Sequence, residues 1–406
     1  MSINKPKIAI VGGGPTGATT SLFLSKHNID HTLFEKATFP RDKICGDGLT
    51  MEVYRALNEI DPDLAEEFTK LYFVKPSGGA FLGDVKGREI DFDYRTENSV
   101  SPLFVAKRVL FDNWLFQKTK NSDHATIKEG VGIDSIKRKE KGFILTTKDG
   151  EEFFDFLIGC DGERSVVKKY LTKDGIKKNR DHYAGAVRAY YKNVVPKRNY
   201  EPLEFYPLET FNGYFWIFHL ENNECNVGLG GLSSEVSEKK INLIKEMENF
   251  IKDNPVISKR FEGAEKLEKT KGCGIPLNSN RFDYFDDGFI LIGDSASMAE
   301  PLTGKGIGIG MMAGYLAIPT IRKAIELNDF SKEILSTYQL AIMNKFEKEW
   351  DELHKFVPLF RKKSIIWSIF NLFKIPFFRN WHAKSTAKRT QKFMVSKGYE
   401  QDYKNL

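Results

Sequence analysis

The hydrophobic pattern near the N-terminus predicts a β-strand, a turn, a helix and a second strand. Ile8–Val11 is apolar at every position, as expected for a strand buried in a parallel sheet. Residues 12–17 read as a turn, residues 18–26 have helical character, and His31–Glu35 is expected to be the second strand. This order is that of a βαβ unit. We therefore predict that the chain begins with an α/β domain containing a Rossmann-like parallel sheet.

Alternating apolar and polar residues predict antiparallel strands further along the chain. Residues 143–147 and 153–160 are expected to pair around a turn, and residues 183–232 to form an antiparallel sheet outside the first domain. The other expected elements are a helix at residues 237–251, a buried strand at 289–292 and a helix at 307–325. Together these elements predict a second domain of the α+β class.

The composition is that of a globular protein whose positive charge is unevenly distributed. The 406 residues are enough for about two to three domains. Hydrophobic residues make up 41% and charged residues 29%, which argues against a disordered or fibrous chain. The formal charge is +6, yet residues 345–406 hold 14 Lys and Arg against 6 Asp and Glu, and the rest is slightly acidic. Because the main body of the chain has no positive surplus, we expect no nucleic-acid partner.

The cysteines and the apolar segments argue against several classes of protein. Cys45, Cys160, Cys225 and Cys273 are far apart and form no C-x-x-C pair, so we expect reduced thiols, no metal and no disulfide framework. We find no secretory signal, and residues 365–378 fall short of the ~20 apolar residues that a spanning helix needs. The sequence thus predicts a cytoplasmic protein.

A glycine pattern follows the first predicted strand directly. Gly12, Gly14 and Gly17 form G-x-G-x-x-G, and Glu35 ends the second predicted strand. In this context the first glycine permits a tight turn, the second lets the backbone approach a pyrophosphate, and the third lets helix and strand pack closely. The helix N-terminus attracts phosphates, and Glu35 favours a ribose 2′-hydroxyl over a 2′-phosphate. A dinucleotide cofactor is therefore predicted.

Further motifs, read in order with the glycine pattern, resemble those of a known family. They are Asp161-Gly162, Gly293-Asp294 and a Cys-Gly-x-Gly-Leu segment that begins at Cys45. The chain resembles the FAD-dependent oxidoreductases of the para-hydroxybenzoate hydroxylase fold and is most similar to the geranylgeranyl reductase family among them. A Tyr-x-Trp-x-Phe-Pro motif of that family is matched at residues 214–219 except at the last position. The resemblance covers about residues 5–330.

The resemblance implies FAD bound by a domain of the glutathione-reductase type. The residues that it implies for cofactor binding are Gly12, Gly14, Pro15, Thr16, Gly17, Glu35, Lys36, Arg41, Cys45, Gly46, Arg108, Val131, Asp161, Gly162, Gly293, Asp294, Pro301, Gly304, Gly306 and Ile307. Arg108 is implied to lie near the phosphates and Asp294 to bond the ribityl chain. A helix that opens near Gly304 would place its positive dipole end where reduced flavin is negative.

Three residues are candidates for a catalytic role. Cys45 lies among basic residues and glycines, which favours a reactive thiolate, although cysteine is also often a small buried residue. Lys305 stands where the family usually has Glu; it can stabilise an anionic reduced flavin or remain a solvated loop lysine. His219 replaces the proline of the aromatic motif, where it can donate a proton or have a hydrogen-bonded structural role.

Three aromatic residues recur at every second position of one predicted strand. Because side chains alternate along a strand, Tyr214, Trp216 and Phe218 share one face. The resemblance implies that they line a substrate pocket above the flavin. The alternative is that they belong to the core of the sheet.

The basic and aromatic-rich C-terminal segment allows three interpretations. Residues 356–378 combine bulky apolar side chains with a Lys/Arg cluster at 361–363. These are the ingredients of an amphipathic helix that makes peripheral contact with an anionic membrane. The same apolar side can instead close the substrate cavity as a lid, or the segment can pack on the main body with its basic face in solvent.

The domain boundaries are expected where the predicted elements change class. The expected units are a discontinuous FAD-binding domain at residues 1–72, 101–180 and 280–345, a substrate domain at 73–100 and 181–279, and a helical C-terminal segment at 346–406.

The activity that the resemblance implies is reduction of a carbon–carbon double bond in a lipophilic, prenyl-like substrate by hydride from flavin N5. The alternatives are a monooxygenase acting on an aromatic or lipid-like substrate, a flavin-dependent halogenase, and a membrane-associated binding protein. Halogenases carry W-x-W-x-I-P, from which Tyr214, Phe218 and His219 depart. No second G-x-G-x-x-G is present, so the electron donor stays open among NAD(P)H, a ferredoxin and another redox partner protein.

Overall fold

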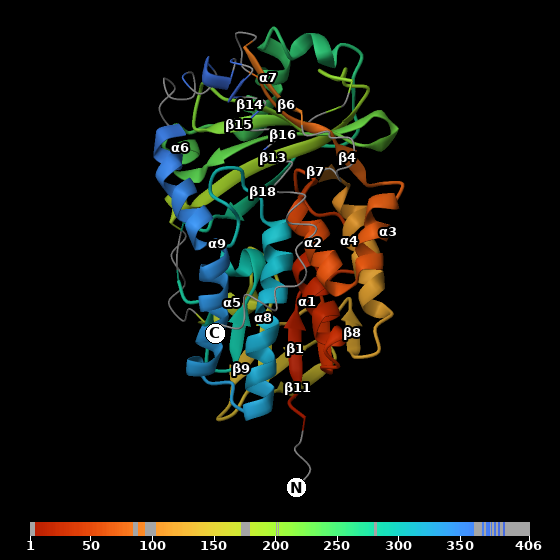
Figure 1. Cartoon of the computed structure of the whole chain (residues 1–406), viewed down its shortest axis with the longest axis vertical. Coiled ribbons are helices and arrows are strands. Elements are labelled where there is room, and N and C mark those ends of the chain that lie inside the picture. The colour runs from red at the N-terminus through yellow and green to blue at the C-terminus, as the bar shows by residue number, and fades with distance from the viewer. Residues whose placement is uncertain are drawn as a thin grey trace.

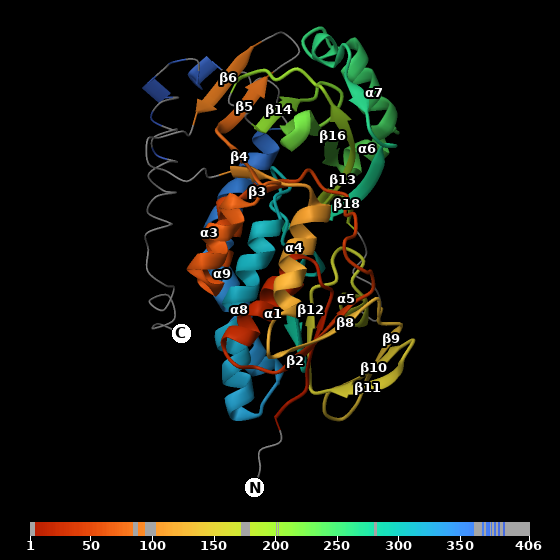
Figure 2. The same ribbon diagram turned by 90° about the vertical axis from the view of Figure 1, so that its right-hand side faces the viewer.

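The structure is a computed structural model of an elongated molecule in two parts (Figures 1 and 2). It describes residues 5–83, 88–93, 103–171, 179–199, 201, 203–279 and 282–360, together with residues 368, 371–373, 375, 377–378, 381 and 385. An α/β part contains the N-terminal strand, and a part built on a large, mostly antiparallel sheet lies at the other end of the long axis.

A parallel sheet forms the centre of the α/β part. Its strand order is β19-β20-β12-β1-β2-β8, and neighbours run parallel except in the β19–β20 pair. The strands are β1 (Ile8–Val11), β2 (His31–Glu35), β8 (Ala125–Glu129), β12 (Phe156–Gly159), β19 (Phe285–Asp286) and β20 (Phe289–Leu291). All residues of β1, β12 and β20 are buried, as their continuously apolar sequences require. The predicted Rossmann-like sheet is confirmed.

Helices and a small sheet surround this parallel sheet. Helix α1 (Pro15–Lys26) contacts α4 and α8, and α8 also contacts α2 and α9. The other helices of this part are α2 (Met51–Ile60), α3 (Pro62–Lys70), α4 (Arg108–Lys120), α5 (Val166–Leu171), α8 (Ile307–Leu327) and α9 (Lys332–Phe360). An antiparallel sheet of β9 (Ser135–Arg138), β10 (Phe143–Thr147) and β11 (Gly150–Phe154) projects to one side in Figure 2.

Glycines of α8 let it pack very closely on α1. A Cβ atom at Gly310 would lie 2.4 Å from the hydroxyl oxygen of Thr16, and one at Gly314 would lie 2.4 Å from that of Thr20. Real Cβ atoms do not approach oxygen so closely, so any larger residue would separate the helices. Because the contacts advance along both helices in the same direction, α1 and α8 run parallel with their N-termini at the same end.

An eight-stranded sheet forms the second part of the molecule. The order is β17-β13-β16-β15-β14-β5-β6, with β18 also paired to β13; β14 and β5 run parallel. The strands are β5 (Gly79–Gly83), β6 (Glu89–Asp93), β13 (Tyr183–Lys192), β14 (Leu203–Pro207), β15 (Gly213–His219), β16 (Glu224–Leu232), β17 (Glu265–Lys266) and β18 (Lys271–Pro276). A three-stranded sheet of β3 (Gly48–Thr50), β7 (Leu103–Val105) and β4 (Lys75–Ser77) completes the described sheets.

The two faces of the eight-stranded sheet have different neighbours. Phe215 and Ile217 pack with residues of α6 (Ser233–Glu238) and α7 (Leu243–Asp253). Trp216 and Phe218, which alternate with them along β15, belong to a cluster on the opposite face that includes Val105 of β7. The second face therefore meets the region between the two parts. The expected domain boundaries remain predictions.

Three expected elements differ from those observed. The segment 153–160 divides at Asp155, whose carboxylate accepts a hydrogen bond from the Lys7 N–H at 2.7 Å. Strand β11 pairs with β10, whereas β12 joins the parallel sheet beside β1. The helix expected at 237–251 is interrupted, and the Asn242 side chain caps a new helix. The first helix begins earlier than expected, at Pro15, because proline suits the first helical position.

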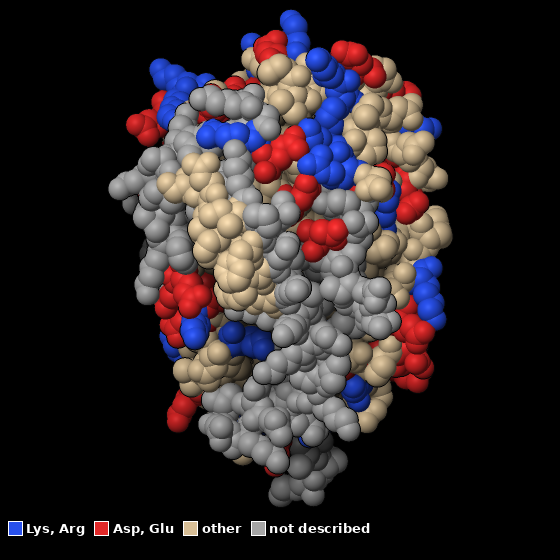
Figure 3. Space-filling view, turned by 45° about the horizontal axis from the view of Figure 1, so that its top comes forward, with Lys and Arg blue, Asp and Glu red and all other residues tan. Residues whose placement is uncertain are grey.

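The C-terminal prediction falls largely outside the described residues, including the basic cluster at 361–363. Helix α9 continues without a break across residue 345, so the expected boundary lies within a helix. Phe377 and Trp381 are 70% and 63% exposed. No helix among the described residues is both long and apolar enough to cross a bilayer. Figure 3 shows Lys and Arg beside Asp and Glu on the end that carries the large sheet.

Candidate functional site

The glycine turn after β1 is held by backbone contacts. Gly12 has φ +103°, and a Cβ atom there would lie 2.5 Å from the main-chain oxygen of Cys160. A Cβ atom at Gly17 would lie 1.8 Å from the main-chain oxygen of Gly12. Helix α1 therefore starts directly against the turn, and both positions require glycine for the backbone alone.

The N-terminus of α1 is built to receive an anion. Gly14 is its N-cap residue, Pro15 and Thr16 follow, no side chain caps the helix, and its first turn contains no acidic residue. The nearest neighbour of a Cβ atom at Gly14 would be Nη2 of Arg41, at 3.4 Å. The helix dipole and a guanidinium group thus act on the same space, which favours a phosphate there.

Glu35 ends β2 beside the glycine turn. Its carboxylate accepts hydrogen bonds from the N–H groups of Gly13 and Ala37, each at 2.8 Å. The Val131 N–H donates to the main-chain oxygen of Glu35 at 2.9 Å, and Lys36 follows with an exposed side chain. A carboxylate held in this way retains lone pairs that can accept hydrogen bonds from ribose hydroxyl groups.

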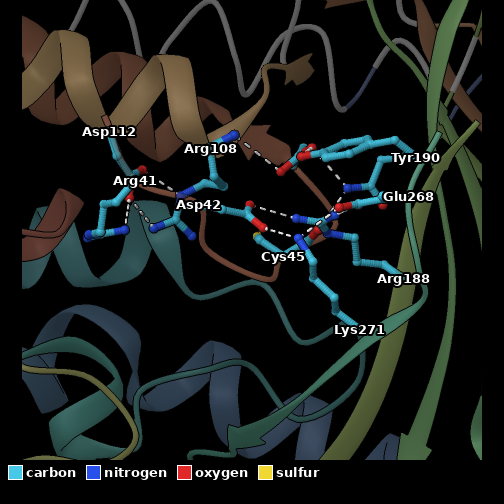
Figure 4. A network of polar contacts seen from close by, with 11 residues as sticks. Arg41, Asp42, Cys45, Arg108, Asp112, Arg188, Tyr190, Glu268 and Lys271 are labelled. Atoms are coloured by element: carbon cyan, nitrogen blue, oxygen red, sulfur yellow. Dashed lines mark hydrogen bonds and ion pairs between the residues drawn. The ribbon is translucent and has the colours of Figure 1, made fainter. Parts of the chain in front are cut away.

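Arg108, Asp112 and Arg41 form a charge cluster with little exposure to solvent (Figure 4). Arg108 donates to both oxygens of Asp112, from Nε at 2.5 Å and from Nη2 at 2.7 Å, and Arg41 Nη1 donates at 3.0 Å. Burial lowers the pKa of Arg108, but Asp112 and then Cys45 raise it above its ordinary value. Because two guanidinium groups share one carboxylate, the cluster keeps a positive charge that suits a phosphate.

Asp161 and Gly162 follow β12 next to the glycine turn. A Cβ atom at Gly12 would lie 2.7 Å from the Cα of Asp161, and Gly162 has φ +78°. Asp161 Oδ2 accepts a hydrogen bond from the Val166 N–H, at the start of α5, at 2.6 Å. Burial raises the pKa of the Asp161 carboxyl. This aspartate fixes the loop that borders the turn.

Asp294 lies between the N-termini of α1 and α8. Gly293 has φ +76°, and a Cβ atom there would lie 2.8 Å from the Thr16 hydroxyl oxygen. Asp294 Oδ1 is 3.5 Å from the Cβ position of Gly306, the N-cap residue of α8, which has no side-chain cap. Burial raises the pKa of the Asp294 carboxyl against the opposing effect of Lys43.

A compact turn at residues 301–306 leads into α8, whose first residue is Ile307. The buried Glu300 carboxylate accepts hydrogen bonds from the N–H groups of Leu302 at 2.7 Å and Thr303 at 2.9 Å. Gly304 has φ +74°, which favours glycine at that position. The Glu300 carboxylate therefore fixes the turn after Pro301. The N-terminus of α8, which no side chain caps, follows this turn and lies beside Asp294.

Lys305 forms ion pairs with acidic side chains of two helices. Its Nζ lies 3.0 Å from a carboxylate oxygen of Glu349 in α9 and 3.5 Å from one of Glu52 in α2. Burial lowers the pKa of Lys305, but Glu52 and then Glu349 raise it above its ordinary value. Its described partners are thus acidic side chains of helices, and a role toward the flavin stays a prediction.

His219 lies on the face of β15 opposite to Trp216 and Phe218. Its Nε2 is 3.1 Å from Oε1 of Glu204, and its Nδ1 is 3.2 Å from the Cys225 sulfur. Burial raises the pKa of Glu204, but His219 and Arg260 lower it to about 2. The structure does not bring His219 together with the other candidate residues.

Cys45 lies on a loop that packs against the aromatic face of the eight-stranded sheet. The main-chain oxygen of Cys45 accepts a hydrogen bond from Asn226 Nδ2 at 2.7 Å. The Cβ positions of Gly46 and Gly48 lie 3.4 Å and 3.3 Å from the ring of Phe218. Because neither glycine has a side chain, the loop lies directly on that ring, with Cys45 half-buried.

Trp216 and Phe218 are the residues of the sheet on which this loop packs. They are 6% and 7% exposed, and Trp216 Nε1 donates to Asn226 Oδ1 at 2.9 Å. The half-buried Tyr214 donates its hydroxyl hydrogen to the main-chain oxygen of Thr303, in the turn before α8. The three aromatic residues share one face as expected from the alternation. Their role in substrate binding stays a prediction.

Several residues that position Cys45 had no role in the sequence analysis. Asp47 accepts hydrogen bonds from the Tyr190 hydroxyl at 2.7 Å and from Asn226 Nδ2 at 2.9 Å. Asn226 stands between apolar residues in a buried strand, and it begins a segment, residues 226–230, that resembles the reductase family, but no role followed from either signal. Asp47 gave a weaker signal, as the one ionisable residue between two motif glycines.

The residues around the glycine turn fit FAD. The two uncapped helix N-termini, the Arg41–Arg108 pair and Glu35 supply donors for the pyrophosphate and acceptors for the adenosine ribose. Asp294 supplies an acceptor between the two helices. Gly14 leaves space for the backbone to approach the cofactor.

A family model agrees with this assignment. The model described as an FAD binding domain matches residues 5–340, which is most of the chain. The match includes the glycine turn, the Asp161 loop and the Asp294 region.

Two curated relatives illustrate the range of similar proteins. The chain is 26% identical over 355 residues to a digeranylgeranylglycerophospholipid reductase from Methanococcus vannielii, with 86% of this chain and 82% of the relative covered. It is 26% identical over 414 residues to conditioned medium factor receptor 1 from Dictyostelium discoideum, with 96% and 75% covered.

Two solved structures show the same fold. A geranylgeranyl bacteriochlorophyll reductase-like protein from Thermoplasma acidophilum superimposes with a TM-score of 0.73 at 21% identity, over 87% of each chain. A flavin-dependent brominase superimposes with a TM-score of 0.74 at 17% identity, over 97% of this chain and 96% of the other. At these identities the similarity establishes the fold alone.

Proposed function

The chain belongs to the FAD binding domain family and is an FAD-dependent oxidoreductase, and on that premise we propose that it reduces a carbon–carbon double bond in a lipophilic, prenyl-like substrate. The observation that carries this proposal is the placement of the Cys45 segment. Residues 45–48 lie on the Phe218 ring with Cys45 beside Arg108. The reductase-like motif at Cys45 and the aromatic strand are thus parts of one site.

The chain's own residues account for binding of the cofactor. Arg41 and the N-terminus of α1 would hold the pyrophosphate, and Glu35 would accept hydrogen bonds from the adenosine ribose. Asp294 would accept hydrogen bonds from the ribityl chain. The N-terminus of α8, at Gly306, would favour negative charge on the reduced ring. Bound and reduced, FAD supplies the hydride for the alkene.

Reduction of an alkene also needs a proton at the second carbon. We assign the donor role to Cys45, which is half-buried beside Arg108 and lies on a loop with fixed backbone contacts. A thiol positioned within reach of the substrate can act as a general acid. Tyr214, Phe205 and Ile275, which are partly buried members of the cluster on the aromatic face of the sheet, supply apolar surface for a prenyl chain.

The proposal is tested with purified holoenzyme and a lipid that carries geranylgeranyl chains. We expect a product heavier by two hydrogens for each double bond reduced, detected by mass spectrometry, with dithionite as the reductant. NAD(P)H and a reduced ferredoxin are then compared as physiological donors. Oxygen-dependent addition of 16 mass units to the lipid, without hydrogenation, would indicate a monooxygenase instead.

A further inference from the structure

Asp47 has an environment that is unusual for a carboxylate. It is completely buried, and its φ of +65° lies in the left-handed region that few residues other than glycine adopt. Burial raises the pKa of its carboxyl to about 6 despite hydrogen bonds from Asn226 and Tyr190, which lower it. A buried charge in a strained backbone is costly for folding, so its contacts call for a physical explanation.

Those contacts come from three separate elements. Tyr190 of β13 and Asn226 of β16 donate to Oδ2, at 2.7 Å and 2.9 Å. The main-chain N–H of Arg108, at the start of α4, donates to Oδ1 at 3.4 Å. The main-chain oxygen of Asp47 accepts from the Ala106 N–H at 3.1 Å. Asp47 therefore joins both parts of the molecule at a point two residues from Cys45.

The other end of the same loop is fixed to the same sheet. Asp42 accepts from Arg188 Nη2 and from Lys271 Nζ, each at 2.8 Å, and Glu268 pairs with both cations (Figure 4). Arg188 lies over the Tyr190 ring, with 4.2 Å between its Cζ and the ring centroid. Residues 42–47 are thus held at both ends, and Cys45 lies between the two attachment points.

We propose that Asp47 is the positioning residue of the Cys45 loop: its carboxylate, held by Tyr190 and Asn226, sets the backbone of Cys45 beside Arg108. The role in catalysis rests on the proposed function, but the positioning itself does not. Asn226 is central, because its one amide nitrogen donates both to Asp47 and to the Cys45 main-chain oxygen. Its amide oxygen is fixed by Trp216 Nε1, which determines the orientation of the amide.

Substitution of Asp47 by asparagine tests this arrangement with almost no change of shape. Asparagine also tolerates the left-handed backbone, so the loop conformation remains accessible. Its NH₂ group must face either Asn226 Nδ2 or the Arg108 N–H, and each of these is itself a donor. In either orientation the variant loses one contact and replaces the charge-assisted hydrogen bonds of the carboxylate by weaker neutral ones, so the loop is held less tightly.

The readout is the rate at which iodoacetamide alkylates Cys45 in the holoenzyme, followed by peptide mass spectrometry. We expect Asp47→Asn to alkylate about tenfold faster at Cys45 than the wild type, and Tyr190→Phe, which removes one donor, to show a smaller increase. Turnover should fall in the same order. Tyr206→Phe is the matched control, because it removes a buried hydroxyl that bonds Glu204 on the same sheet and should leave both rates unchanged.

The outcomes separate the two proposals. Faster alkylation without any alkene reduction by the wild type would keep the positioning role and reject the reductase. Wild-type alkylation rates in both Asp47→Asn and Tyr190→Phe would overturn the positioning role, whatever the activity. If Asp47→Asn does not fold, the milder Tyr190→Phe decides on the same measurement.

Discussion

Asn226 donates a hydrogen bond to the main-chain oxygen of Cys45 at 2.7 Å, although the two residues are 181 positions apart in the chain. This contact attaches the loop that follows the βαβ unit to a buried strand of the eight-stranded sheet. The same amide nitrogen holds Asp47. The relative position of the two parts is thus fixed at the residue to which we assign proton donation.

The glycine turn gives the first prediction. Gly17→Ala should yield protein with little bound flavin and a lower thermal midpoint, because the new Cβ atom would lie 1.8 Å from the Gly12 oxygen. Such overpacking destabilises by ~1–3 kcal/mol. The flavin-to-protein ratio and a melting curve measure both effects. Gly185→Ala is the control, since its Cβ would meet only side-chain atoms, Leu243 Cδ1 at 3.3 Å and Ser233 Oγ at 3.7 Å. A yellow variant with the wild-type ratio would contradict the prediction.

Arg41 should contribute to FAD affinity more than to stability. In Arg41→Ala, Arg108 still pairs with Asp112. The buried Glu35 carboxylate loses a cation at 3.9 Å but keeps its two main-chain N–H donors. A lost hydrogen bond between charged groups is worth ~1.5–3 kcal/mol, which corresponds to roughly a ten- to hundredfold weaker affinity. Titration of apoprotein with FAD measures it. Arg198→Ala, which removes partly buried ion pairs with Glu89 and Asp91 at the large sheet, should bind FAD normally. Equal affinities in both variants would refute the assignment.

Cys45 should be needed for turnover and not for flavin binding. We expect Cys45→Ala to retain its flavin and to reduce the alkene about a hundredfold more slowly, the usual range for loss of a proton donor. Steady-state rates and flavin content distinguish the two effects. Cys225→Ala, on the opposite face of the sheet, serves as the matched thiol control. Full turnover by Cys45→Ala would exclude chemical participation of the thiol.

His219 should matter for stability and not for turnover. His219→Gln weakens the network around Glu204, which His219 and Arg260 hold ionised with a pKa of about 2. Because that pKa lies below the ordinary value of 4.5, the network stabilises the protein above about pH 4.5 and loses this effect as the pH falls toward 2. We expect the variant's melting temperature to be lower at pH 7 and to approach that of the wild type in acid. A selective fall in turnover would instead make His219 a catalytic residue.

The contribution of Asp47 to stability changes with pH in the opposite direction to that of Glu204. Its pKa is raised from 3.8 to about 6, so the folded protein binds an extra proton between these values and becomes less stable as the pH rises through them. Asp47→Asn removes the ionisation. The stability of the variant relative to the wild type should therefore increase from pH 4 to pH 7, by up to ~3 kcal/mol. Denaturant titrations at several pH values measure the difference, and a constant difference would contradict the assignment.

Local patterns were enough to predict the βαβ unit and its glycine turn. Continuous apolar runs and the spacing of Gly12, Gly14 and Gly17 act within about thirty residues, so no distant contact is needed to interpret them. The division at Asp155 was not predictable in this way. It depends on a hydrogen bond to Lys7, which lies 148 positions earlier.

The same limit applies to the candidate site. The sequence identified Cys45 through a motif, but the partners that hold its loop come from β13 and β16, and their pairing with the loop is a property of the fold. The alternation of Tyr214, Trp216 and Phe218 predicted their shared face. His219 was considered as a proton donor, but it lies on the other face in the structure, because that residue is one position out of phase with them.

The most direct test of alkene reduction is anaerobic oxidation of the reduced flavin in a stopped-flow instrument. The holoenzyme is reduced with dithionite and mixed either with a geranylgeranyl-bearing lipid or with oxygenated buffer, and absorbance near 450 nm is followed. We predict rapid recovery of the oxidised absorbance with the lipid, together with a hydrogenated product, and slow recovery with oxygen alone. No reaction with the lipid but rapid reaction with oxygen would contradict the reductase and favour an oxygen-dependent activity.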